Sequence, residues 1–240
     1  MGSRLITERA SHIDAAGISQ IADTEGLFCT QIDASRRRAR RAPIGTYGGT
    51  RDASYDRQVT KIAPPLTPRQ AERIEPLGLL ADEPAALAAA WSKVDGFWAE
   101  TIAQASRLDE DQLNTRVNDE WSFIETLRHL INVTDAWIGD LVLEKPSPYD
   151  PIGLPPDFFS PGPELGLDLA ARPSLTHVVD TRSRRMAEAR DAITHVPVDG
   201  LDRLCARFGG QFTVLGAFQN VIFEEWAHHY YAIRDLASLR

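Results

Sequence analysis

Cysteines, long apolar runs and excess positive charge are all scarce in this chain of 240 residues. Its two cysteines, Cys29 and Cys205, cannot form a disulfide framework, which favours a reducing compartment. No apolar run approaches the roughly 20 residues needed to cross a bilayer, and the first residues lack the apolar core of a secretory signal. The formal net charge of -8 opposes nonspecific nucleic-acid binding. We therefore expect a cytoplasmic protein that binds neither membranes nor nucleic acid.

The first 75 residues are the less regular part of the chain. Their apolar residues are sparse and follow no sustained period. The basic run RRRARR at 36–41 is a candidate nucleic-acid contact, but no aromatic residue interleaves it to stack on bases. We expect residues 1–75 to be an irregular or partly disordered extension with a solvated basic patch, and residues 76–240 to form one folded domain.

Four long segments of the second part have apolar residues at spacings of three and four, as amphipathic helices do. They lie at about residues 84–107, 122–145, 174–195 and 213–239. Ser122 and Glu125 form an S-x-x-E capping box at the start of the second. Opposite its apolar stripe, the third carries Arg182, Arg184, Arg185 and Glu188. No convincing strand pair accompanies them, so the sequence predicts an all-α protein, a four-helix bundle.

A proline-rich segment at 146–173 joins the second helix to the third. Its aromatic and aliphatic side chains can pack against the bundle; they are Tyr149, Ile152, Leu154, Phe158 and Phe159. We therefore expect a long ordered crossover loop rather than a flexible linker. Loops of this length in compact domains are often functional.

The last helix carries ionisable residues within its apolar pattern, in the stretch VIFEEWAHHYYAIRDL at 221–236. Glu224 with His228, and Glu225 with His229, are two carboxylate–imidazole pairs one helical turn apart. The apolar period puts Glu225 and His229 on the core-facing line, and the other pair on a more polar flanking line. A carboxylate and an imidazole so spaced can chelate one divalent ion. The alternative is a Glu–His hydrogen bond without a metal.

His129 is a third candidate, in the stretch ETLRHLINVTDAW of the second helix. By helical angle it lies at the edge of the apolar face, beside Thr126 and Val133. A histidine at such an edge is more often a surface or hydrogen-bonded residue than a ligand. From the residues alone, metal ligation and simple hydrogen bonding both stay open.

Three stretches together resemble the DinB-like superfamily over about residues 76–240: WSFIETLRHLINVTDAWI at 121–138, PIGLP at 151–155 and EEWAHHYYAIRDL at 224–236. More closely, they resemble an actinobacterial branch with ETLRHL and EEWxHHxYAxRDL motifs. The resemblance implies a four-helix bundle with a divalent metal, held by one histidine of the second helix and an H-x-x-x-H pair of the last. Carried onto this chain, it implies ligation by His129, Glu225 and His229, with Glu225 in place of the middle histidine. His228 is the alternative ligand if the last helix is rotated.

The same resemblance implies a metal-dependent enzyme with Zn, Ni, Fe or Mn as the cofactor. It favours a thiol S-transferase, or a hydrolase, in which the metal activates water or a low-molecular-weight thiol such as mycothiol or bacillithiol for attack on a small-molecule substrate. Tyr230 and Arg234 are candidate substrate contacts. The competing hypothesis is a non-catalytic stress-response or protein-interaction bundle with a structural or degenerate metal site. Pairing through helix faces predicts a homodimer.

Overall fold

The computed structural model of the chain describes residues 66–156, 161, 163–207 and 210–239. The predictions for residues 1–65, including the basic run at 36–41, and for Phe158 and Phe159 lie outside these residues. The described elements are, in chain order, α3 (Pro68–Ile74), η3 (Glu75–Leu77), α4 (Pro84–Ala105), α5 (Glu110–Leu113), α6 (Phe123–Thr134), η4 (Asp135–Val142), η5 (Pro163–Leu165), α7 (Leu175–His195), η6 (Val198–Asp202), β1 (Leu204–Arg207), β2 (Gly210–Thr213) and α8 (Val214–Ser238).

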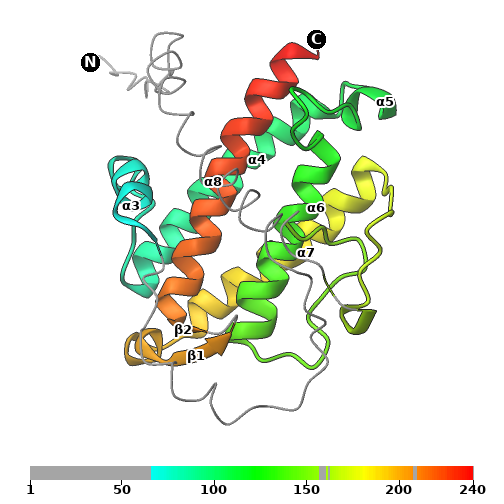
Figure 1. Cartoon of the computed structure of the whole chain (residues 1–240). Coiled ribbons are helices and arrows are strands. Elements are labelled where there is room, and N and C mark those ends of the chain that lie inside the picture. Colours follow the sequence, from blue (N-terminus) through cyan, green and yellow to red (C-terminus); the bar gives the residue numbers. More distant parts are fainter. Residues whose placement is uncertain (1–65, 157–160, 162, 208–209, 240) are drawn as a thin grey trace, which may run out of the picture. The chain divides into compact units, whose positions relative to one another are not determined.

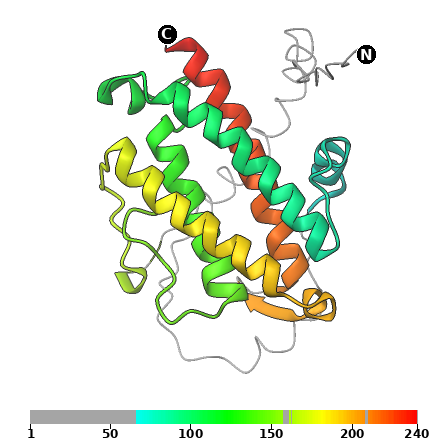
Figure 2. The same cartoon turned by 180° about the vertical axis from the view of Figure 1, so that it is seen from behind.

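Helices α4, α6, α7 and α8 are long and form a four-helix bundle (Figures 1 and 2). Both α4 and α6 pack against α7 and against α8, so the four helices enclose one core. Helix α6 continues directly into η4, a π-helix that α8 also contacts. The prediction of an all-α bundle is confirmed. Among the described helices, none combines the length and the apolarity that crossing a membrane requires.

Local sequence determines where these helices begin. The Ser122 hydroxyl accepts a hydrogen bond from the Glu125 N–H, and the Glu125 carboxylate accepts one from the Ser122 N–H, so the predicted capping box is confirmed. The hydroxyl groups of Ser174 and Thr213 cap α7 and α8 in a similar way. Pro84 occupies the first turn of α4, where a helix needs no N–H donor.

Two tryptophans of α4 lie at the centre of the bundle. The side chains of Trp91 and Trp98 are fully buried. The indole N–H of Trp91 donates to the Met186 carbonyl of α7, and that of Trp98 donates to the Glu225 carbonyl of α8, each over 3.2 Å. A buried indole needs such an acceptor, because an unbonded polar N–H in an apolar core is costly. The two bonds therefore fix α4 relative to both neighbours.

One ion pair also lies in this core. The side chains of Arg182 in α7 and Glu225 in α8 are 4% and 0% exposed, and a guanidinium nitrogen lies 2.5 Å from the carboxylate. The guanidinium also lies over the ring of Trp98, 5.0 Å from its centroid. The sequence placed Arg182 on the polar side of its helix. The structure buries it instead, because it is the partner that the buried carboxylate of Glu225 requires.

The crossover loop between α6 and α7 is long for a geometric reason. The two helices run in the same direction, so the chain between them must return along the bundle (Figure 1). Near its start, the Asp150 N–H donates to the carboxylate of Asp135 in η4 over 2.8 Å. Arg185 of α7 forms ion pairs with both of these aspartates. The loop is thus attached to two helices at once.

Two short features differ from the sequence expectations. Residues 204–213 form the antiparallel hairpin β1–β2, in which Cys205 pairs with Phe212, where the sequence predicted no strand pair. Residues 66–75, assigned to the irregular extension, contain α3, whose Ile74 is fully buried. Strands of four residues and a helix of seven are too short to show a readable apolar period.

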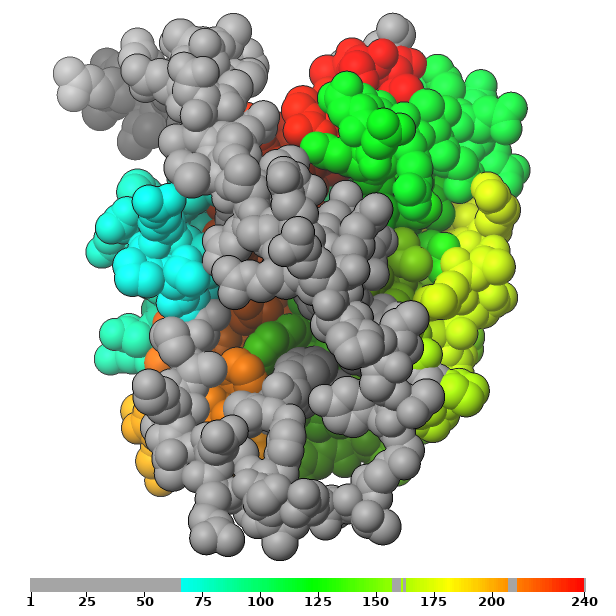
Figure 3. Space-filling model, viewed as in Figure 1, coloured from blue at the N-terminus to red at the C-terminus, as the bar shows by residue number. Residues whose placement is uncertain are grey.

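The end of α8 lies beside the segment around α5, red beside green in Figure 3. The side-chain amide of Gln112 donates to the Leu239 carbonyl over 3.0 Å. This bond satisfies one of the carbonyl groups that the end of a helix leaves without a partner.

Replacing Arg182 alone by methionine should lower the free energy of unfolding by about 3 kcal/mol, because it leaves the Glu225 carboxylate buried without its counterion. In the pair itself, Arg182 Nε and Glu225 Oε1 have no hydrogen-bond partner among the described residues. An apolar pair should therefore serve nearly as well, and Arg182→Met with Glu225→Leu should recover most of the loss. Urea unfolding of the metal-free protein measures both effects. Arg184→Met, at an exposed position, is the control; equal losses in all three variants would contradict the prediction.

The carboxyl group of Asp135 should make stability depend on pH. Burial raises its pKa from 3.8 to about 6, against the opposing effects of the Asp150 N–H and Arg185. The folded state therefore holds this proton to higher pH than the unfolded chain does, so its stabilisation is complete below about pH 4 and is lost as the pH rises through 6. Between pH 4 and 7 the stability of wild type relative to Asp135→Asn should fall by about 2–3 kcal/mol, as two pKa units imply. Urea unfolding across this range measures it, and a constant difference would refute it.

Candidate metal centre

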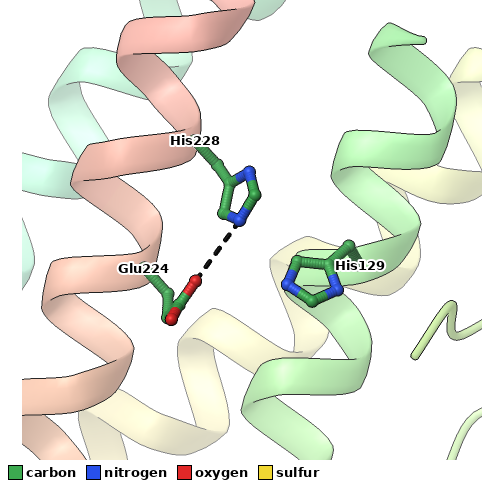
Figure 4. A group of neighbouring side chains, drawn as sticks. All are labelled: His129, Glu224 and His228. Atoms are coloured by element: carbon green, nitrogen blue, oxygen red, sulfur yellow. Dashed lines mark ion pairs between the residues drawn. The ribbon is translucent and has the colours of Figure 1, made fainter. Parts of the chain in front are cut away.

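Three side chains with metal-binding atoms meet where α6 and α8 pack together. They are His129 of α6 and Glu224 and His228 of α8 (Figure 4). One candidate ligand atom from each lies within 4.8 Å of those of the other two. Among the residues that the structure describes, this is the one group of three or more histidine, cysteine, aspartate or glutamate side chains close enough to hold an ion.

The helices account for this convergence. Glu224 and His228 are one helical turn apart, so both project from the same side of α8. His228 Nε2 lies 3.3 Å from the Glu224 carboxylate. The centroid of the His129 ring lies 4.8 Å from that of His228. Because α6 packs against α8, the pair on one helix faces the single histidine on the other.

The protonation of His129 suits a ligand. Its Nδ1 lies 3.1 Å from the Leu154 carbonyl oxygen, which can only accept, so Nδ1 carries the ring proton. The other nitrogen, Nε2, is left with a lone pair. Burial, together with the charge of His228, lowers the pKa of His129 to about 3, so the ring is neutral at pH 7. Metal ligation requires a neutral imidazole of this kind.

Glu224 contributes the negative charge of the group. Burial alone would raise the pKa of its carboxyl, but the hydrogen bond and charge of His228 lower that pKa overall. Glu224 is therefore ionised at neutral pH. Two imidazoles and one carboxylate form the donor set, and such sets bind Zn²⁺ and Fe²⁺ in proteins. By the donor types of all three residues, and by the protonation states of His129 and Glu224, the group fits a divalent ion.

Aromatic side chains border the group. The Trp121 ring lies 4.4 Å from the His129 ring and 5.9 Å from the His228 ring, between centroids. The ring of Tyr231, nearly one turn further along α8, also contacts His228, with 6.1 Å between the ring centroids. These rings shield the imidazoles without burying the group, since the side chains of His228 and Glu224 keep 17% and 29% of their exposure. Part of the surface of these two side chains therefore stays in contact with solvent.

The sequence-predicted trio of His129, Glu225 and His229 is not brought together. Glu225 points into the core and pairs with Arg182 of α7. His229 Nε2 lies 2.8 Å from the hydroxyl of Thr101 in α4, and its ring packs on Trp98. The reason is rotation about α8: consecutive residues differ by about 100° in direction, so this pair faces α7 and α4 while the preceding pair faces α6.

The two proposed substrate contacts also have definite places. Arg234 is bonded to the carboxylates of Glu120 and Asp235, so its charge is already compensated. Tyr230 packs on Tyr231, and it is Tyr231 that contacts His228. Glu224 is the one member of the group that the sequence did not lead us to predict as a ligand. The sequence did contain a sign of this ligand. The i, i+4 pair Glu224–His228 lies on the polar flanking line of α8, and His129 lies at the corresponding edge of the apolar face of α6.

A comparison with family models decides the relationship of the chain. The model of the DinB superfamily matches residues 93–232, more than half of the chain. The chain belongs to the DinB superfamily. The matched segment of this DinB-superfamily chain contains all three residues of the candidate centre. Searches of curated proteins and of solved structures found no match.

Family membership also bears on the ligand pattern. The resemblance implied an H-x-x-x-H pair on the last helix, and the structure brings Glu224 and His228 to that role rather than Glu225 and His229. The pattern is thus shifted by one residue from the expected position, and glutamate again stands in the place of the first histidine of the pair. The other implied ligand, His129, is part of the group.

Adjacent histidines of α8 provide a direct test of the centre. Wild type stripped of metal should take up about one equivalent of Zn²⁺. His228→Ala should weaken binding by more than the 10–100-fold expected for losing an outer-shell partner, because it removes a ligand itself. His229→Ala should bind as wild type does, since that side chain bonds Thr101 instead. Isothermal titration and bound-metal analysis measure this.

Circular dichroism should first show that both variants fold. Loss of binding in His229→Ala with retention in His228→Ala would restore the ligand set expected from the sequence and reject the group seen in the structure.

Proposed function

We propose that this protein binds a divalent metal at His129, Glu224 and His228, and that it is a metal-dependent enzyme which transfers a low-molecular-weight thiol to an electrophilic small molecule. The observation that carries the proposal is the convergence of two imidazoles and one carboxylate at a partly exposed place between α6 and α8. Membership of the DinB superfamily supports it.

The number of protein ligands favours catalysis over a structural role. Structural zinc sites are closed by four protein ligands, whereas catalytic sites have three and keep a position open. A divalent ion held here supplies Lewis-acid chemistry, which lowers the pKa of a thiol or a water molecule so that it becomes a nucleophile at neutral pH. Zinc and ferrous iron suit the donor set best; nickel and manganese are the alternatives.

The surrounding side chains then have separate tasks. His129 is held in one tautomer by Leu154, so its Nε2 is ready for ligation without rearrangement. The carboxylate of Glu224 lowers the net positive charge of the metal and its ligands. An anionic thiolate would therefore bind this metal less strongly than a metal held by three neutral imidazoles. Trp121 and Tyr231 offer apolar surface next to His228, suited to the carbon skeleton of a substrate.

Arg234 enters the proposal in a changed role. Because Glu120 and Asp235 already occupy its guanidinium, it serves to hold the Tyr231 ring, over which it lies at 5.2 Å from the centroid. We therefore expect the substrate to be a neutral electrophile rather than one that carries a carboxylate for Arg234 to bind.

Thiol consumption tests the proposal. Protein reconstituted separately with Zn²⁺, Fe²⁺, Ni²⁺ or Mn²⁺ is mixed with mycothiol, bacillithiol or glutathione and a panel of electrophiles such as epoxides, activated alkenes and alkyl halides. We expect loss of free thiol, and a thioether product by mass spectrometry, in wild type and in His229→Ala. His228→Ala should lose at least about 100-fold in rate, as removal of a group that stabilises the transition state does.

If metal binds and no thiol is consumed with any electrophile, the transferase proposal fails while the metal centre stands. Ester and amide substrates then test the hydrolase alternative. If no metal binds at all, the group is a structural Glu–His cluster and the non-catalytic interpretation takes its place.

A further inference from the structure

The segment 150–154 of the crossover loop, here called the strap, is hydrogen-bonded to two consecutive residues of α6. The Leu154 N–H donates to the Arg128 carbonyl over 3.0 Å. The Leu154 carbonyl accepts from His129 Nδ1 over 3.1 Å. One loop residue thus both donates to the helix and receives the proton of a candidate metal ligand. The position of Leu154 therefore bears directly on the orientation of the His129 ring.

The side chain of Arg128 holds the strap in place. It is 4% exposed although it carries a charge. Its guanidinium donates to three backbone carbonyls of the loop, from Nε to Ile152 at 2.8 Å and from the same NH2 group to Asp168 at 2.9 Å and Leu169 at 3.4 Å. A planar guanidinium can hold several acceptors at fixed angles, which a lysine cannot do. Two separate parts of the loop are therefore joined through this one side chain.

The strap is also held at its beginning. The Asp150 N–H bonds the buried carboxylate of Asp135, and Arg185 pairs with both aspartates. Within the strap, the Gly153 N–H donates to the Asp150 carbonyl over 2.9 Å. A Cβ at Gly153 would lie 3.2 Å from that carbonyl oxygen and 3.3 Å from Leu167 Cδ2, both tighter than ordinary contacts, and 3.4 Å from Asn132 Cβ of α6. A larger residue here would therefore crowd the strap against its own backbone and against Leu167.

We infer that Arg128 is a positioning residue for the metal centre, acting on His129 through the strap. Its own side chain leaves α6 about 100° away from that of His129, and all its hydrogen bonds to described residues go to the loop. By fixing Ile152, it fixes the Leu154 carbonyl two residues later, and that carbonyl keeps the proton of His129 on Nδ1 and the lone pair on Nε2. Outer-shell acceptors orient metal-bound histidines in this way. The inference rests on the proposed metal centre for its functional meaning.

The test reads the tautomer and the metal affinity separately. Nitrogen-15 NMR of histidine-labelled, metal-free protein distinguishes the two neutral tautomers, and His129→Gln assigns the signal. Wild type should show His129 protonated on Nδ1. Arg128→Met should convert much of the signal to the Nε2-protonated form or to an exchanging mixture. Zn²⁺ affinity, by competition with a chelating dye, should fall 10–100-fold.

Gly153→Ala crowds the strap at its own Asp150 carbonyl and at Leu167 without touching Arg128, and it should change both readouts in the same direction if Arg128→Met does not fold. Arg107→Met, at an exposed position, is the control and should change neither. A folded Arg128→Met or Gly153→Ala that keeps the wild-type tautomer and binds Zn²⁺ within threefold of wild type would overturn the inference, even if its melting temperature falls. Wild type that binds no Zn²⁺ but whose tautomer responds to these variants would instead refute the proposed function while the action of the strap stands.

Discussion

The buried carboxylate of Glu225 constrains the rest of the structure. In the core it requires a counterion, and Arg182 of α7 provides one, with its guanidinium over the ring of Trp98. The Trp98 indole bonds the backbone of the same residue. Together these contacts set the rotation of α8 about its own axis. That rotation directs the Glu224–His228 pair towards α6 and His129, and directs His229 towards Thr101 of α4.

Much of the fold could be predicted because long helices repeat their signal. The four apolar stripes, the Ser122–Glu125 capping box and the proline-rich crossover all recur in the structure at or near their expected places. The hairpin β1–β2 and helix α3 could not be predicted in this way, because each spans fewer residues than a period needs to become visible.

The candidate site was predicted in part, for a physical reason. His129 could be found by resemblance, and the two Glu–His pairs of α8 were visible in the sequence. Apolar periodicity ranks helix faces by how deeply they are buried, and it therefore selected Glu225 and His229. A metal centre that reacts with substrate needs polar ligand groups that solvent can reach. Such groups lie at the boundary between the buried and the exposed face of a helix. Whether a core carboxylate meets a metal or an arginine depends on which helix lies opposite, and for Glu225 that helix is α7.

The residues of the centre come from helices that are far apart in the chain, His129 from α6 and the pair Glu224–His228 from α8. The indole bonds and the core ion pair hold the bundle together independently of these side chains. The ion would thus join two segments that are already placed, rather than organise a disordered chain. Binding of the ion would then contribute little to the free energy of folding. Small domains that are unfolded without metal differ, because in them metal binding drives folding. A protein built in this way would keep its fold whether or not the ion is bound.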